Sequence, residues 1–224
     1  MPSALSIACL TVPLIAVALP LWLLWAGALH DTTPFNVTMS VALDVDQPPQ
    51  EFDVEVHPEW APRGAERFHE LVEAGFFSGV RIFRVEDFVV QWGIHGDPAI
   101  SAKWKHRTLY DDPPGKQSNV RGTLAFAAAG RDSRTTQVFM NKRDNPSLDR
   151  SFRPFARVVG EAGIELLASR VYRPGDRGSS PAVLSQQRIH EEGNRYLEEK
   201  HPHMSFFTGA VMKLREEDHP RDEL

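Results

Sequence analysis

The chain has 224 residues, of which 42% are hydrophobic and 25% are charged, and its formal net charge is −5. This length fits one large domain or a domain with appendages, and the mild acidity argues against a nucleic-acid-binding protein, which usually carries a basic patch or stripe. The single cysteine, Cys9, lies in an apolar N-terminal segment, so the rest of the chain can form neither an internal disulfide nor a cysteine metal site.

The N-terminal segment predicts targeting to a membrane. Residues 4–29 contain no charged side chain and are long enough to span a bilayer, which takes about 20 residues of helix. Trp22 and Trp25 are typical of the membrane–water interface, which favours an anchor. Ala26-Gly27-Ala28 fits the small-x-small pattern of a signal-peptidase site, which favours removal. We therefore assign residues 1–30 to a signal peptide or a transmembrane signal anchor.

The next region begins with patterns typical of strands. Residues 36–44 alternate polar and apolar side chains, and residues 52–56 do the same after a turn at Pro48-Pro49. We expect these two strands to pair antiparallel. Pro62 then stands where a helix would begin, and apolar side chains fall on one face of this helix up to Gly75.

Residues 80–85 predict another strand, whereas residues 94–120 read as a long loop. The loop is indicated by Gly96-Asp97-Pro98, by a second turn-forming run at residues 111–115 and by the scarcity of periodic apolar positions. The histidines and acids in this loop lack the spacing of metal ligands, so we predict no metal site and no cofactor.

The centre of the chain has the composition of a peptide-binding groove. Two strands, residues 123–126 and 137–140, flank a polar loop and a run of small residues, Ala127-Ala128-Ala129-Gly130. The alanines leave room for a ligand against the backbone, whose N–H and C=O groups stay available for pairing. Gln137 adds a side chain that donates and accepts hydrogen bonds, and Phe139 adds a flat apolar wall. From these residues alone, an ordinary hairpin with a core Phe is the alternative.

The C-terminal part predicts a helix, a strand and a charged tail. Residues 185–200 have a helical apolar face that includes Gly193, and residues 204–214 read as a closing strand. Residues 216–224 form the tail, whose last four residues, Arg221-Asp222-Glu223-Leu224, resemble the Lys-Asp-Glu-Leu signal for retention in the endoplasmic reticulum. A solvated charged tail is the alternative, but the N-terminal targeting segment favours retention.

Three blocks of the sequence resemble motifs of the cyclophilin-type peptidyl-prolyl cis-trans isomerases. The first is Gly122-Thr123-Leu124-Ala125-Phe126-Ala127-Ala128-Ala129-Gly130, followed by Gln137-Val138-Phe139. The second is Arg84, followed by Phe88-Val89-Val90-Gln91-Trp92-Gly93, and the third is Leu148-Asp149, followed by Phe155 and a hydrophobic strand. Their order and spacing are close to those of the family, and the similarity is greatest to its bacterial-like branch.

This resemblance implies a mainly β fold for residues 35–215. The expected architecture is a closed eight-stranded antiparallel barrel capped by two helices, to which the N-terminal hydrophobic helix is added. Closure of such a barrel removes exposed strand edges. The implied activity is peptidyl-prolyl cis–trans isomerisation of proline-containing polypeptides, without a metal or a cofactor.

Arg84 is the residue expected to carry the chemistry. Rotation about a peptidyl-prolyl bond breaks the resonance of the amide against a barrier of about 18–20 kcal/mol. In the twisted state the proline nitrogen becomes pyramidal and gains a lone pair, to which a fixed guanidinium can donate. Such a group binds the twisted state better than either planar isomer, which is what catalysis requires.

The resemblance also implies the residues that bind the substrate. The proline ring would be held by Phe88, Val89, Phe139 and Leu148. Gln91 and Gln137 would bind the peptide together with the backbone around Ala128. Phe152 matches the His or aromatic residue that the family often has a few positions after the Leu. The full expected set is Phe88, Val89, Gln91, Ala127, Ala128, Gln137, Phe139, Leu148 and Phe152.

Two departures from the family pattern leave an alternative function open. The spacing from Arg84 to Phe88 is one residue shorter than usual, and we assume that a turn absorbs the difference. Ser147 stands where the family often has an aromatic residue. The alternative is a non-catalytic scaffold or chaperone of the same fold that binds proline-containing peptides. In either case we expect the protein to be located in the endoplasmic reticulum. Its expected partners are the membrane, through residues 4–29 if they are not cleaved, and a retrieval receptor. We expect no binding of nucleic acid.

Overall fold

The computed structural model describes residues 33–115, 117–172 and 184–213. Its strands are β1 (Phe35–Ala42), β2 (Gln50–Val56), β3 (Arg84–Val85), β4 (Val89–Trp92), β5 (Thr123–Phe126), β6 (Val138–Asn141), β7 (Pro154–Val158) and β8 (Phe206–Met212). Its helices are α2 (Pro62–Glu73), α3 (Pro98–Lys105), the short 3₁₀ turn η1 (Pro146–Leu148), α4 (Glu161–Glu165), the π-helical turn η2 (Leu166–Arg170), α5 (Gln186–Glu192) and α6 (Asn194–Lys200).

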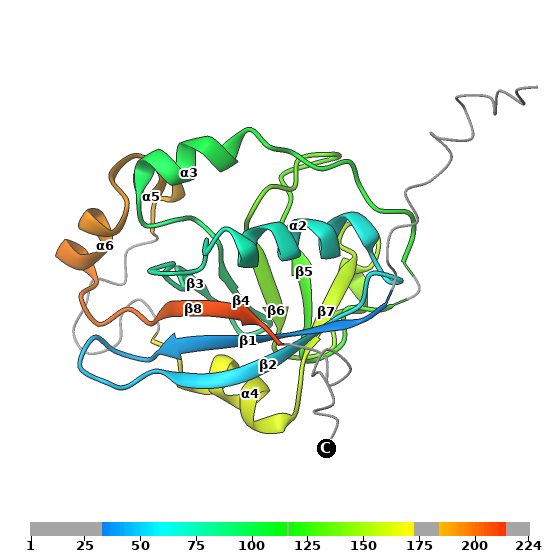
Figure 1. The fold of residues 1–224 in the computed structure, drawn as a ribbon, viewed down its shortest axis with the longest axis horizontal. Helices are drawn as coiled ribbons and strands as arrows, with labels where there is room; N and C mark the ends of the chain where they lie inside the picture. The colour runs from blue at the N-terminus through cyan, green and yellow to red at the C-terminus, as the bar shows by residue number, and fades with distance from the viewer. Residues whose placement is uncertain (1–32, 116, 173–183, 214–224) are drawn as a thin grey trace, which may run out of the picture. The chain divides into compact units, whose positions relative to one another are not determined.

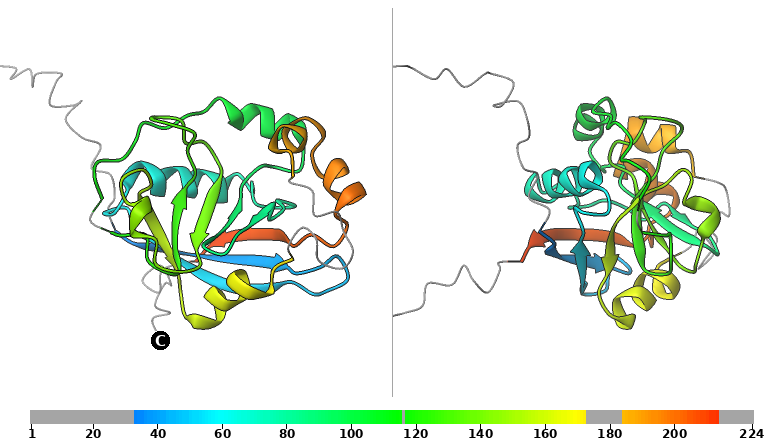
Figure 2. Two further views of the ribbon diagram at one scale, coloured as in Figure 1. Left: turned by 180° about the vertical axis from the view of Figure 1, so that it is seen from behind. Right: turned by 90° about the vertical axis from the view of Figure 1, so that its right-hand side faces the viewer.

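The eight strands form one antiparallel sheet in the order β3-β4-β6-β5-β7-β2-β1-β8. The sheet curls into a half-barrel, with α2 across one side and α4 on another, while α3, α5 and α6 gather at one end (Figures 1 and 2). This confirms the mainly β class and the eight antiparallel strands.

The strand ladder is open between its two terminal strands, β3 and β8. Backbone hydrogen bonds across this gap come from the segment just before β3, where Gly79 N donates to Phe207 O (2.8 Å) and Ile82 N donates to Ser205 O (2.9 Å). Of the strand predicted over residues 80–85, only Arg84–Val85 belongs to the ladder. The closed barrel of the sequence prediction is therefore, in the structure, a curled sheet whose terminal strands are not paired with each other.

The first hairpin and the first helix form as predicted. β1 and β2 pair antiparallel, with Val37 opposite Val54, and both side chains are completely buried. Helix α2 begins at Pro62, and its apolar face, which includes Phe68, is buried in the core. The Phe68 ring packs 5.2 Å from that of Phe155 on β7, so α2 is fixed to the sheet by aromatic contacts.

Residues 94–120 are not a single loop, because helix α3 lies within them. The segment Gly96-Asp97-Pro98, which the sequence analysis interpreted as a turn, is the N-terminal cap of this helix. The Asp97 carboxylate accepts a hydrogen bond from Ala99 N at 2.8 Å, and Pro98 occupies the first helical turn. A capping Asp followed by Pro is a helix-start signal as well as a turn signal, which is why the prediction was wrong.

The helix predicted over residues 185–200 is divided into α5 and α6 at Gly193. This glycine has a φ of +62°, and a Cβ placed on it would lie 2.0 Å from the carbonyl oxygen of Gly96. Asn194 N donates to the same Gly96 oxygen at 2.8 Å. The close approach of the segment before α3 therefore interrupts the helix, and the domain has more helices than the two predicted.

The predictions for the two ends of the chain fall outside the described residues. Both the targeting segment, residues 1–30, and the charged tail, residues 216–224, lie there. Within the described ranges, no helix combines the length and the apolar character needed to cross a membrane.

Candidate functional site

The short link between Arg84 and Phe88 forms a tight turn between β3 and β4. Arg84 lies opposite Gln91 in the strand register, and Glu86 N donates to Val89 O at 2.9 Å to close the turn. The turn thus absorbs the missing residue, as assumed from the sequence, without moving Arg84 to the other face of the sheet.

The strand register places Arg84 in one row with the centre of the groove. Gln91 on β4 is opposite Phe139 on β6, and Phe139 is opposite Ala125 on β5. Residues directly opposite each other in antiparallel strands project from the same face. Arg84, Gln91, Phe139 and Ala125 therefore line the same side of four adjacent strands.

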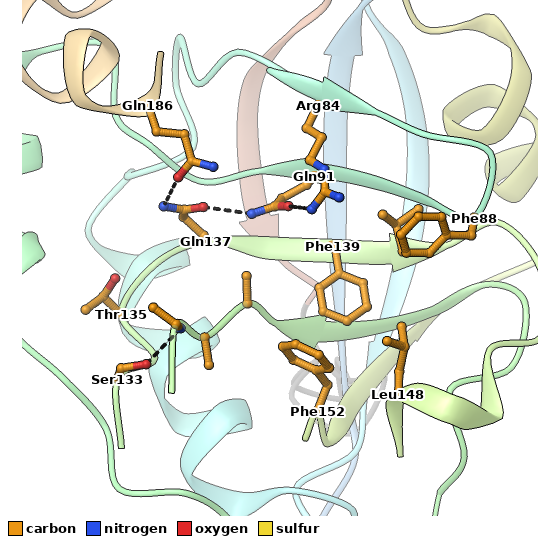
Figure 3. A pocket seen from close by; sticks show the side chains of 14 residues that line it. Arg84, Phe88, Gln91, Ser133, Thr135, Gln137, Phe139, Leu148, Phe152 and Gln186 are labelled. Atoms are coloured by element: carbon orange, nitrogen blue, oxygen red, sulfur yellow. Dashed lines mark hydrogen bonds between the residues drawn. The ribbon is translucent and has the colours of Figure 1, made fainter. Parts of the chain in front are cut away.

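All ten residues predicted for the site line a single pocket of about 450 Å³. Figure 3 shows this pocket, with amide side chains towards one end and aromatic and aliphatic side chains towards the other. The structure adds Ala129, which belongs to the run of small residues seen in the sequence, and three lining residues that sequence reasoning missed: Ser133, Thr135 and Gln186.

The apolar end of the pocket is built around Phe139. Val89, Ala125 and Phe139 form a small buried cluster on which Phe88, Ala127, Leu148 and Phe152 pack. The rings of Phe139 and Phe152 meet edge to face, with centroids 5.3 Å apart and an interplanar angle of 88°. This arrangement leaves ring faces and edges exposed to the pocket, which suits a small apolar ring such as that of proline.

The polar end is a directed chain of hydrogen bonds that begins at Arg84. Arg84 Nη1 donates to Gln91 Oε1 (3.2 Å), and Gln91 Nε2 donates to Gln137 Oε1 (2.7 Å). Gln137 Nε2 in turn donates to Gln186 Oε1 (3.1 Å; Figure 3). Gln91 and Gln137 each accept from one neighbour and donate to the next, so each is fixed in one of its two flipped orientations.

The guanidinium of Arg84 is held from several sides but is not buried. Its side chain is 44% exposed, and its Nε lies 3.4 Å from Glu86 Oε1. Its Cζ lies 5.9 Å from the centre of the Phe88 ring, which belongs to the apolar end. Arg84 therefore presents a permanent positive charge at the junction between the two ends of the pocket.

The small-residue run forms an edge of the pocket with free backbone groups. Ala127 N donates to Gln137 O, whereas Ala129 N and Gly130 N both donate to Ser133 Oγ. Within the described ranges, neither the N–H nor the C=O of Ala128 has a hydrogen-bond partner. The backbone N–H and C=O of Ala128 are therefore available for hydrogen bonds to an extended peptide.

A buried network of amides supports the pocket from behind. Asn119 Nδ2 donates to Phe152 O (3.0 Å) and to Asp149 Oδ1 (2.8 Å), and Asn141 Nδ2 donates to Asn119 Oδ1 (3.1 Å). Asn145 Nδ2 reaches Phe88 O at 3.1 Å. The network thus fixes the backbone of two aromatic residues at the apolar end.

The electrostatics of this network depend on Asp149. Partial burial opposes ionisation of its carboxyl group, but hydrogen bonds from Ser118 and Asn119 outweigh that effect and hold its pKa below the usual value. Asp149 is therefore ionised at neutral pH.

Within the described ranges, no group of three or more His, Cys, Asp or Glu side chains is arranged to hold a metal ion.

Comparison with known proteins identifies the family. Residues 40–189 match the family described as "Cyclophilin type peptidyl-prolyl cis-trans isomerase/CLD". The chain is 31% identical over 134 residues to peptidyl-prolyl cis-trans isomerase-like 2 of Gibberella zeae, which covers 57% of this chain and 22% of that protein. It is 34% identical over 107 residues to peptidyl-prolyl cis-trans isomerase A of Dickeya dadantii, covering 44% and 53% of the two chains.

The fold also matches solved structures. A cyclophilin-type peptidyl-prolyl cis-trans isomerase of Cryptosporidium parvum superimposes with a TM-score of 0.58 at 16% identity, covering 82% of this chain and 99% of that one. The same protein in the presence of the dipeptide Ala-Pro gives a TM-score of 0.56. The chain spans less than two thirds of the length of the first curated relatives that it matches. Since the family match covers residues 40–189, well over half of the chain, this protein belongs to the family of cyclophilin-type peptidyl-prolyl cis-trans isomerases.

Proposed function

We propose that this protein catalyses the cis–trans isomerisation of peptidyl-prolyl bonds in proline-containing polypeptides. One observation carries the proposal: Arg84 shares a row of the sheet with Gln91 and Phe139 and so lies between the polar and the apolar end of one pocket. A proline ring held against Phe139 would bring its nitrogen towards the guanidinium.

The chemistry needs only binding and a fixed donor. The apolar end would hold the proline ring, and the Ala128 backbone together with Gln137 would pair with the flanking peptide. Arg84 would then donate to the lone pair of the twisted nitrogen, which is absent from both planar isomers. Stabilisation of the twisted state alone lowers the barrier. The hydrogen bond from Arg84 to Gln91 reduces the freedom of the guanidinium before the substrate binds.

The test is the rate at which residues 31–224 isomerise a short X-Pro peptide. We expect acceleration by the unchanged protein and a loss of about 10²-fold with Arg84→Ala, comparable to the removal of one donor in other electrostatic sites. Arg157→Ala is the matched control, because Arg157 is also exposed but pairs with Glu55 on β2, outside the pocket. Retention of full activity by Arg84→Ala would contradict the proposed role.

The second candidate is a non-catalytic scaffold that binds proline-containing peptides. Ser147, which precedes Leu148 at the rim of the pocket, favours it, because the family often has an aromatic residue there. A folded protein that binds the peptide but does not accelerate its isomerisation would support this candidate over the enzyme.

We further propose that the protein acts in the endoplasmic reticulum or at its membrane. The uncharged residues 4–29 and the C-terminal Arg221-Asp222-Glu223-Leu224 support this location, because a targeting segment and a retrieval signal are expected together. Deletion of the last four residues should release the protein into the medium if residues 1–30 are cleaved, and should let it reach later membranes if they are not. An unchanged location would contradict the proposed retrieval.

A further inference from the structure

A second cleft of about 410 Å³ adjoins the candidate site. It shares Ala128, Ala129 and Phe152 with the first pocket, so these residues form a common ridge between the two. An extended peptide advances about 3.3 Å per residue. A residue close to a proline held against Phe152 would therefore reach across the ridge, past the unpaired backbone of Ala128.

Two of the arginines that line this cleft, Arg150 and Arg153, form no ion pair with a carboxylate in the described ranges. Arg150 is exposed and makes no hydrogen bond or ion pair with any residue in the described ranges. Arg153 donates from Nη1 to Asp149 O and from Nε to Pro113 O (3.3 Å), which fixes its guanidinium on two backbone carbonyls. Asp149 accepts hydrogen bonds from Ser118 and Asn119, and its charge also interacts with that of Arg153.

The acidic residues that line the cleft, Asp111 and Asp112, already have hydrogen-bond partners. Asp112 is completely buried and accepts hydrogen bonds from Arg134 Nη1 (2.8 Å) and from two backbone N–H groups. Asp111 accepts from Asp132 N (3.2 Å) and lies 3.5 Å from Arg134 Nε. Both carboxylates thus face one guanidinium, that of Arg134, whereas Arg150 has no charged partner in the described ranges. Four arginines and two aspartates line the cleft, so its lining carries a net positive charge, and Arg150 and Arg153 lie within three residues of Phe152 in the chain.

We propose that this cleft is a second subsite that takes the carboxylate side chain of an acidic residue flanking the proline of the substrate. Arg153 offers a guanidinium held in place in advance, and Arg150 adds an unpaired charge beside it. Such guanidinium pairs match the two oxygens of a carboxylate. The proposal rests on the proposed function, because it names the class of substrate that the same groove prefers.

The experiment compares peptides that differ at one position beside the proline. Each flanking position in turn carries Glu, Gln or Lys, and both the Kd of labelled peptides and kcat/KM for their isomerisation are measured. At one flanking position we expect the Glu peptide to bind about two- to fivefold more tightly than the Gln peptide, as for an exposed ion pair, and the Lys peptide to bind least well. The preference should shrink in high salt, because exposed charges are screened.

Substitution of Arg150 tests the assignment with little effect on the fold, since Arg150 is exposed and has no hydrogen bond or ion pair to lose in the described ranges. Arg150→Ala should reduce the preference for Glu, and Arg150→Glu should reverse it in favour of Lys. Arg195→Glu makes the same change of charge on α6, outside the cleft lining, and should leave the preference unchanged.

Two results would overturn the subsite: equal Kd values for the three peptides at every flanking position, or a preference for Lys in the unchanged protein. The second result would assign the cleft to its aspartates instead. Because the Kd is measured without turnover, a charge preference in binding would be seen even if no peptide were isomerised. Failure of the subsite and failure of the proposed activity are thus distinguishable.

Discussion

Gln186, the first residue of α5, accepts a hydrogen bond at 3.1 Å from Gln137, a side chain 49 residues earlier in the chain. This bond extends the chain Arg84–Gln91–Gln137 to a helix at one end of the domain. It also sets which way the Gln137 amide points, because Gln137 can donate to Gln186 only while its oxygen faces Gln91. The orientation of the amides near Arg84 therefore depends on α5.

Removal of the Gln186 side chain should weaken catalysis without unfolding the protein. We expect Gln186→Ala to lower kcat/KM about two- to tenfold, the range that one neutral hydrogen bond commonly contributes. Gln186→Glu keeps an acceptor oxygen and should restore most of the loss. Gln187→Ala, which removes an exposed bond to Glu191 on the same helix, is the control. Equal kcat/KM for Gln186→Ala and the unchanged protein would show that Gln137 needs no such support.

The buried amide network should contribute strongly to stability. Asn119 is completely buried, and Asn119→Ala would leave the Phe152 carbonyl without a partner. It would also remove one hydrogen bond each from Asn141 and Asp149, which keep their bonds to Thr123 and Ser118. We expect the free energy of unfolding to fall by about 2–4 kcal/mol, because an unsatisfied buried polar group costs about 1–3 kcal/mol. Urea unfolding measures this change. Ser40→Ala, which removes an exposed bond to Glu51, should change the stability by less than about 0.5 kcal/mol.

The sequence predicted the groove well, because its residues lie on strands that have strong local patterns. Phe139 and Gln91 are in buried strands, and antiparallel pairing fixes which faces they share. Arg84 was harder, since the prediction depended on an assumed turn before Phe88. The resemblance to a known family decided it, and the register then placed Arg84 opposite Gln91.

The helices around the groove were predicted less well, because their limits are set by distant contacts. Gly193 lies inside a helical pattern, and only its approach to Gly96 shows why α5 ends there. Gln186 follows a loop and carries no local signal that points to Gln137. Side chains that join a site through tertiary packing of this kind cannot be read from periodicity.

Gly75 is a control for Gly193, which is constrained both by the close approach and by its backbone, because a φ of +62° with a ψ of −147° is essentially accessible to glycine alone. Both have a positive φ, +62° and +61°, but a Cβ on Gly75 would meet no atom within 4 Å, whereas one on Gly193 would clash with Gly96 O at 2.0 Å. Gly75→Ala should therefore lower the free energy of unfolding by only about 1–2 kcal/mol, the cost of a left-handed L-residue. Gly193→Ala should lower it by clearly more. Equal losses in urea unfolding would contradict the close approach.

The stability of the domain should fall as the solution becomes acidic from neutral pH. Burial lowers the pKa of His95, His190 and His201 below the ordinary value of about 6.5, so the folded state favours their neutral forms. Between the lowered pKa values and about 6.5 the unfolded chain binds more protons than the folded one, and stability therefore rises with pH in that window. The contribution of these histidines to stability is fully present above about pH 6.5 and is lost as the pH falls through the window.

Urea unfolding at a series of pH values from about 7.5 to about 5 would measure this loss of stability. His190→Gln removes one of the three titrating groups and keeps a polar side chain beside Ser101, which lies 2.6 Å from His190 Nδ1. We expect a flatter pH dependence for this variant than for the unchanged protein. His106→Gln changes an exposed side chain at the end of α3 and should keep the original slope. Stability that is constant or increases on acidification would show that these buried histidines do not govern the acid response.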